Sequence, residues 1–134
     1  MTKQEHITYW INTSEHDWKD VQKMFKVRSY VPCLFFTHLV FEKLAKAIWV
    51  KNNEGNTPPR THNINSILQQ SNMELSEDEY NFFNKLNRFQ MENRYPDYVG
   101  ILYQTTNRQI VKTILLESEN HRLNLLNSLN SNEI

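Results

Sequence analysis

The stretch PCLFFTHLVFEKLAKAIWVKN, residues 32–52, decides the fold, because its apolar residues recur with the period of an α-helix. Leu34, Phe41 and Ile48 stand seven residues apart, and His38 and Ala45 occupy the helical steps between them. Other apolar residues widen this stripe: Phe35, Leu39 and Trp49. A stripe of this width predicts a helix that is buried on more than one side, at the centre of a helical bundle.

The rest of the chain also carries helical patterns, and it contains only 2 glycines and 4 prolines among 134 residues. Folds rich in β-turns need more of both residues. The predicted helices cover about residues 3–26, 32–52, 62–71, 76–92 and 104–129. Three breaks in the helical pattern are clear: one at residues 30–32, a loop at 52–61, and a proline- and glycine-containing loop at 93–100. We therefore predict an all-α, up-and-down bundle of four long helices and one short helix, in a single domain over residues 1–134 with a frayed tail.

Charge, hydropathy and cysteine content indicate which partners, compartment and cofactors to expect for this protein. Fifteen basic residues balance 15 acidic ones, for a net charge of +0. The overall charge therefore does not indicate electrostatic binding of nucleic acid by the whole surface, but it is compatible with a local basic pocket. No apolar run approaches the roughly 18 residues that a membrane span requires. The lone Cys33 lies in an apolar run and is expected to be buried, which fits a reducing cytoplasm. The spacing of the histidines and this cysteine predicts no metal site, and no cofactor is expected.

Three short motifs follow one another at the predicted helix boundaries. The central helix carries Phe35 and then Glu42-Lys43-Leu44-Ala45-Lys46-Ala47. Thr61-His62-Asn63-Ile64 opens the short helix, and Arg94-Tyr95-Pro96-Asp97 follows the fourth. Together they resemble the F…EKxxKA, THDL and RYPD motifs of HEPN domains, the nucleotide-binding domains of higher eukaryotes and prokaryotes. The resemblance spans about residues 5–126.

This resemblance implies a four- to five-helix bundle that is commonly dimeric and has a role in nucleotide or RNA chemistry. Many family members are toxin ribonucleases with an Arg-x4–6-His motif, and many are encoded beside a small nucleotidyltransferase. Here the positions after Arg94 that would hold the histidine are Val99, Gly100 and Ile101. None of these side chains can act as an acid or base, so no catalytic residue is predicted. The amide-bearing pair that precedes Glu42 in the family is also replaced, by the apolar residues 39 and 40.

Arg94 is the first candidate for a ligand-binding residue, because a guanidinium can make bidentate contacts to phosphate. The alternatives are an ion pair with Asp97 or Glu92, or a cap on the carbonyls of a helix end. Asp97 is itself a candidate, with a turn-forming role beside proline as its alternative. Tyr95 could stack on a base, and so could the nearby Tyr98 and Tyr103, or these rings could form an interface.

Lys43 and Lys46 could supply cations to the same phosphate, but they could equally face solvent, with Glu42 pairing with Lys46. His62, at the start of the short helix, is a candidate to contact the ligand, and the alternatives are that it caps this helix or packs against the loop at 52–61. His38 lies on the apolar stripe and is expected to be a hydrogen-bonded core histidine.

These residues support three hypotheses. The first is a non-catalytic, homodimeric module that binds a nucleotide or RNA phosphate and pairs with a nucleotidyltransferase. The second is an atypical, toxin-like ribonuclease. The third is a purely structural adaptor or dimerisation domain.

Overall fold

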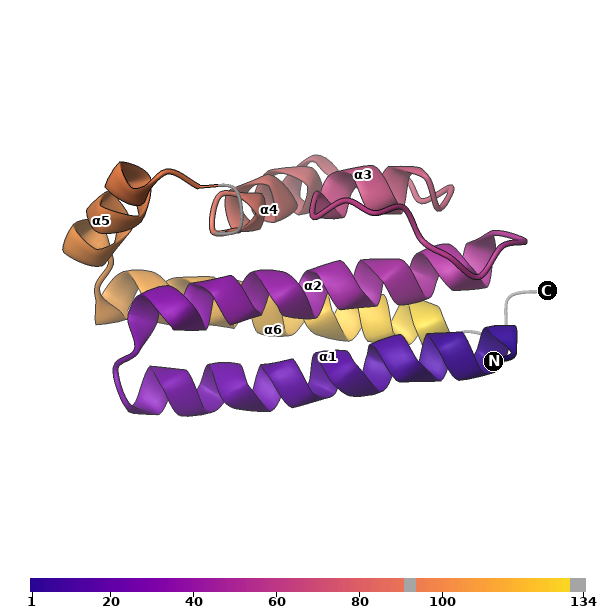
Figure 1. Cartoon of the computed structure of the whole chain (residues 1–134), viewed down its shortest axis with the longest axis horizontal. Helices are drawn as coiled ribbons and strands as arrows, with labels where there is room; N and C mark the ends of the chain where they lie inside the picture. The colour runs from indigo at the N-terminus through magenta and orange to yellow at the C-terminus, as the bar shows by residue number, and fades with distance from the viewer. Residues whose placement is uncertain (91–93, 131–134) are drawn as a thin grey trace.

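The protein folds into helices packed around one central helix, as a computed structural model shows for residues 1–90 and 94–130 (Figure 1). The described helices are α1 (Lys3–Lys26), α2 (Tyr30–Asn52), α3 (Ile64–Gln69), α4 (Glu77–Asn87), α5 (Pro96–Thr105) and α6 (Arg108–Asn130). The all-α bundle predicted from the sequence is confirmed, and no strand occurs among these residues.

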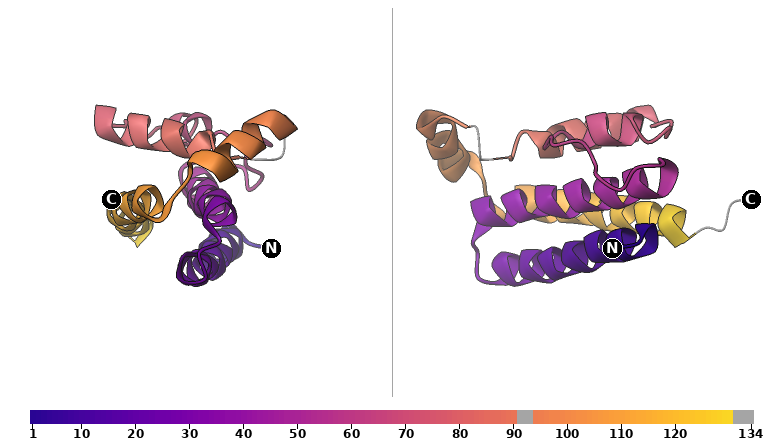
Figure 2. Two further views of the ribbon diagram at one scale, coloured as in Figure 1. Left: turned by 90° about the vertical axis from the view of Figure 1, so that its left-hand side faces the viewer. Right: turned by 45° about the vertical axis from the view of Figure 1, so that its right-hand side comes forward.

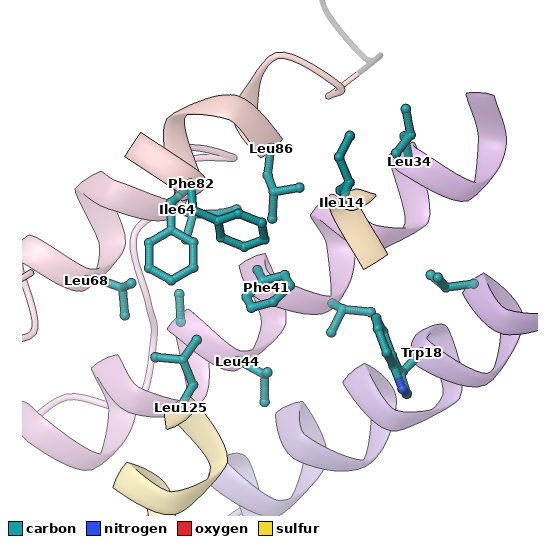
Figure 3. Close-up of a cluster of buried hydrophobic side chains, with 14 of the residues drawn as sticks. Trp18, Leu34, Phe41, Leu44, Ile64, Leu68, Phe82, Leu86, Ile114 and Leu125 are labelled. Carbon is teal, nitrogen blue, oxygen red and sulfur yellow. The ribbon is translucent and has the colours of Figure 1, made fainter. Parts of the chain in front are cut away.

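Helix α2 is the axis of the bundle, because each of the other helices contacts it. Helices α1 and α6 lie against it on neighbouring sides, and α3 and α4 cover it from above (Figures 1 and 2). Phe41 and Leu44 of α2 are fully buried, as the wide apolar stripe predicted. Figure 3 shows them surrounded by side chains from four other helices: Trp18, Ile64, Leu68, Phe82, Leu86, Ile114 and Leu125.

Local sequence signals fix where the helices begin. Ser76 accepts a hydrogen bond from the backbone N–H of Glu79, and the Glu79 side chain accepts one from the N–H of Ser76. This is the capping box that the sequence predicts for α4. Thr2 and Glu5 form a second capping box at the start of α1.

The prediction for residues 93–100 was wrong over most of its length, because α5 begins at Pro96. Proline is suited to the first turn of a helix, where its missing N–H would have no partner. Gly100 lies inside this helix, and a Cβ atom there would meet nothing within 4 Å. The preceding helix, expected to reach residue 92, ends at Asn87, and residues 91–93 lie outside the described part of the structure.

Buried polar residues tie α1 to α2. Asp17 lies on the buried side of α1, and the Lys43 ammonium of α2 lies 2.6 Å from its carboxylate. Cys33 is fully buried, as predicted, and its thiol donates to the carbonyl of Val21, 3.4 Å away. Across the ranges that the structure describes, none of the helices has both the length and the apolar character needed to cross a bilayer.

Candidate functional site

A polar pocket lies where the loop after α2 leads into α3 and meets the end of α4. Its volume is about 410 Å³. The lining residues are Arg60, Thr61, His62, Asn63, Asn87, Gln90 and Arg94. Two of these described lining residues are arginines, and none of them is acidic.

Arg94 reaches back over the end of α4. Its Nε donates to the carbonyl of Gln90 and its Nη2 donates to the carbonyl of Asn87, both at 3.1 Å. The guanidinium carbon also lies 4.8 Å from the centre of the Tyr98 ring. This is the helix-end cap that was one alternative in the sequence analysis. These two bonds hold the plane of the guanidinium in place at the edge of the pocket, which Arg94 lines.

A residue of the central helix α2, Glu42, holds the His62 side chain in place. The Nδ1–H of His62 donates to Oε1 of Glu42 at 2.8 Å; this nitrogen must carry the hydrogen, because a carboxylate can only accept. The other Glu42 oxygen accepts from Lys46 at 3.1 Å, which confirms the predicted Glu42–Lys46 pair. Lys46 also lies 5.2 Å from the centre of the Trp10 ring. A row of contacts therefore runs from α1 through α2 to the pocket.

The backbone beneath the pocket is anchored by His38. Its Nε2–H donates to the carbonyl of His62 at 2.8 Å, as predicted for a hydrogen-bonded core histidine. Burial is the main cause that lowers the pKa of His38 below its usual range. At neutral pH the lowered pKa favours the neutral ring, and its hydrogen is on Nε2, because the carbonyl of His62 can only accept.

Two asparagines connect the start of α3 to the end of α4 at the side of the pocket. Asn87, near the end of α4, accepts from the N–H of Ile64 at 3.1 Å and donates to the side chain of Asn63 at 3.2 Å. Asn63 caps α3 by accepting from the N–H of Ser66 at 3.0 Å. These hydrogen bonds join the start of α3 to the end of α4 and fix the Asn63 and Asn87 side chains at the pocket.

The structure brings some of the predicted site residues together and leaves others apart. Arg94 and His62 line the same pocket, and Lys46 reaches it only through Glu42. Lys43, Tyr95 and Asp97 do not line it. Lys43 pairs with Asp17, Tyr95 is 82% exposed, and Asp97 is exposed in the first turn of α5.

Sequence reasoning missed Arg60, Asn87 and Gln90 as pocket residues. Arg60 immediately precedes the Thr61-His62 motif, and this position was a usable signal. Asn87 and Gln90 carry no signal in the sequence, because they reach the pocket only through the packing of α4 against α3. Among the described residues, no group of three or more histidine, cysteine, aspartate or glutamate side chains could hold a metal ion.

The chain is therefore a small helical module built on one central helix, with a polar pocket lined by arginine and amide side chains. The HEPN domain model matches residues 7–120, which is most of the chain. The chain therefore belongs to the HEPN domain family, and at the level of the family this supports a nucleotide- or RNA-related module. The search of curated proteins and the search of solved structures each gave no match.

Proposed function

We propose that this HEPN domain binds the phosphate of a nucleotide or of RNA in the pocket between Arg60, His62 and Arg94, without cleaving it. One observation carries the proposal. Cationic or hydrogen-bonding side chains from the loop before α3 and from the segment after α4 line one pocket, and no described lining residue is acidic.

The chemistry of the lining suits a phosphate group. Arginine presents planar N–H groups that match two phosphate oxygens, and its guanidinium stays charged at every physiological pH. The amides and the hydroxyl of Thr61 add neutral donors around these charges. Because the overall net charge is +0, attraction for an anion would have to come from this local arrangement rather than from the whole surface.

The same arrangement supports binding more than catalysis. The positions where a family ribonuclease would carry its histidine are Val99, Gly100 and Ile101, and all three lie on α5. They supply no group that could give or take a proton.

Thermal unfolding with and without ligand tests the proposal. ADP, ATP and a short single-stranded RNA serve as probes, and a ligand present at 100 times its Kd should raise the free energy of unfolding by about 2.7 kcal/mol. Arg94→Ala should remove most of this stabilisation. Arg88→Ala, six residues earlier and outside the pocket lining, should keep it. No response of the wild type to any of these probes would favour the adaptor hypothesis.

The homodimer and the nucleotidyltransferase partner also belong to this proposal. HEPN domains often dimerise, and the measured mass in solution would test whether this one does. The nucleotidyltransferase rests on the family resemblance alone, as does a toxin–antitoxin setting. A nucleotidyltransferase gene beside this one would support both.

An atypical ribonuclease is the second candidate, favoured by one specific observation. Although no histidine follows Arg94 at the family's spacing, His62 and Arg94 line the same pocket. Incubating the protein with labelled RNA in the presence of EDTA tests this candidate. Cleavage that is lost in both His62→Gln and Arg94→Ala would replace the binding-only proposal with a catalytic one.

A further inference from the structure

Three uncharged side chains that line the polar pocket use their acceptor oxygens to hold the surrounding structure in place. Oδ1 of Asn63 accepts from the N–H of Ser66 at 3.0 Å and from Nδ2 of Asn87 at 3.2 Å. Oδ1 of Asn87 accepts from the N–H of Ile64 at 3.1 Å. The hydroxyl of Thr61 accepts from the N–H of Asn63 at 3.2 Å. These oxygens are therefore already engaged within the protein.

Three other groups in the lining are N–H donors, on Arg60, Asn63 and Arg94. The exposed Arg60 guanidinium and the Nδ2 amide of Asn63 have no hydrogen-bond or ion-pair partner in the described structure. The Arg94 guanidinium is held at the pocket by its bonds to two backbone carbonyls. A guanidinium and an amide nitrogen can only donate, so a group bound by all three must accept at several atoms.

This distribution of donors does not suit a nucleobase. The edge of a base carries donors beside acceptors, and an asparagine that recognises adenine uses both its oxygen and its nitrogen. The oxygens of Asn63 and Asn87 are engaged elsewhere. Bases also stack on aromatic rings, but the described lining contains no phenylalanine, tyrosine or tryptophan. We therefore expect the pocket to hold its ligand through a group other than the base.

A terminal phosphate matches these donors better than a phosphate inside an RNA strand does. A phosphate monoester carries about −1.5 to −2 charges at pH 7 and has three strong acceptor oxygens. An internal phosphodiester has a single charge and one such oxygen fewer, and the strand leaves it in two directions. The donors come from residues 60–63 and from the segment after α4, and Figure 1 shows α3 and α4 side by side. An end group can therefore be approached from both segments.

We infer that the pocket selects a terminal phosphate monoester, at the end of an RNA strand or on a mononucleotide, and binds it without distinguishing the base. This inference rests on the proposed function and names the chemical group that the same pocket recognises. Arg60 and Arg94 supply the positive charge, and Nδ2 of Asn63 supplies a neutral donor. An internal phosphate is held more weakly, because it offers less charge and fewer oxygens to the same donors.

The first test compares short RNA strands of one sequence by fluorescence anisotropy. A strand with a 5′-phosphate or a 3′-phosphate should bind about tenfold or more tightly than the strand with hydroxyls at both ends, because charge-assisted hydrogen bonds are gained. Equal binding of all three strands overturns the inference. AMP as competitor distinguishes the two sources of the phosphate: displacement shows that a mononucleotide suffices, and a preferred phosphorylated strand that AMP does not displace assigns the site to RNA ends.

A series of mononucleotides tests whether the base matters. The Kd values of AMP, GMP, CMP and UMP should agree within about threefold, because specific contacts to a base edge would separate them by more. Adenosine, which lacks the phosphate, should not raise the thermal unfolding temperature. A preference of more than about tenfold for one base, or binding of adenosine as tight as that of AMP, overturns the inference.

Asn63→Asp tests the neutral donor with little change of shape. Aspartate keeps an oxygen for the N–H of Ser66 and is an equally good residue at the start of a helix, but it replaces Nδ2 with a negatively charged oxygen. The phosphorylated strand should bind about tenfold or more weakly. Asn81→Asp, exposed on α4 outside this pocket, is the matched control and should bind like the wild type. Unchanged binding by a folded Asn63→Asp variant overturns the assigned contact, and circular dichroism checks the folding.

The outcomes separate this inference from the proposed function. Phosphorylated and hydroxyl strands that bind equally, with binding lost in Arg94→Ala, leave the phosphate pocket in place and overturn the selection of a terminal group. A wild type that binds none of the strands or nucleotides overturns both. Arg60→Ala should narrow the difference between the two kinds of strand, and a full difference in that variant shows that Arg60 does not contribute to the selection.

Discussion

Glu42 brings a carboxylate into the interior of the bundle, where both of its oxygens are engaged. One oxygen accepts from His62 and the other from Lys46, and the residue is 4% exposed. A carboxylate in this position has two consequences. It holds the Lys46 ammonium close to the core, and it fixes the orientation of the histidine that lines the pocket.

Removing this carboxylate should therefore affect stability and ligand binding together. We expect Glu42→Ala to lower the free energy of unfolding by about 2 kcal/mol, because two charge-assisted hydrogen bonds are lost. The same change should weaken nucleotide binding, since His62 loses its anchor. Urea denaturation and calorimetry measure the two effects. Glu54→Ala, in the exposed loop after α2, is the control and should change stability by less than about 0.5 kcal/mol.

His38 should make the stability of the protein depend on pH. Burial lowers its pKa in the folded state, whereas in the unfolded chain the pKa of histidine is about 6.5. Below about pH 6.5 the unfolded chain takes up a proton that the folded protein does not, so the free energy of unfolding falls as the pH drops. Above that pH the contribution of His38 is fully present.

Urea denaturation between about pH 7.5 and pH 5 measures this dependence on pH. His38→Gln should flatten it, because glutamine can donate to the His62 carbonyl but does not titrate in this range. The exposed His16 provides the comparison, and His16→Gln should leave the slope unchanged. An unaltered slope in His38→Gln would mean that other groups cause the loss of stability in acid.

At the scale of single elements, the long helices follow from the sequence and α5 does not. Periodic apolar residues and capping signals predicted α1, α2 and α4 close to their true starts. Pro96 and Gly100 are ambiguous signals, because proline both ends helices and begins them. Pro96 begins α5. Gly100 lies inside this helix, although a glycine beside a proline predicts a loop.

Gly100 offers a direct check on α5. A Cβ atom there would meet nothing within 4 Å, and the residue has no positive φ. We expect Gly100→Ala to raise the free energy of unfolding by about 0.4–1 kcal/mol, because alanine loses less backbone entropy in a helix. Thermal unfolding measures the shift. A loss of stability instead would be inconsistent with a regular helix at this position.

At the scale of the whole molecule, the site could be predicted only in part. Arg94 and His62 carried recognisable motifs, and the structure places both in one pocket. Arg60 and Asn87 join them through the packing of the loop and α4 around α3, which periodicity does not encode. The position of Lys43 could not be foreseen either, because its partner Asp17 lies on another helix, 26 residues earlier in the chain.

Because Cys33 is buried between α1 and α2, the reaction of its thiol can report the separation of these two helices. The chain has a single thiol, which packs between α1 and α2, and burial raises its pKa to about 11. Because the thiolate is the reactive form, a disulfide reagent at neutral pH can label this atom only after the joint between the two helices has come apart. The rate of labelling therefore measures how often the two helices separate. No other thiol of the chain competes for the reagent, and no probe has to be introduced.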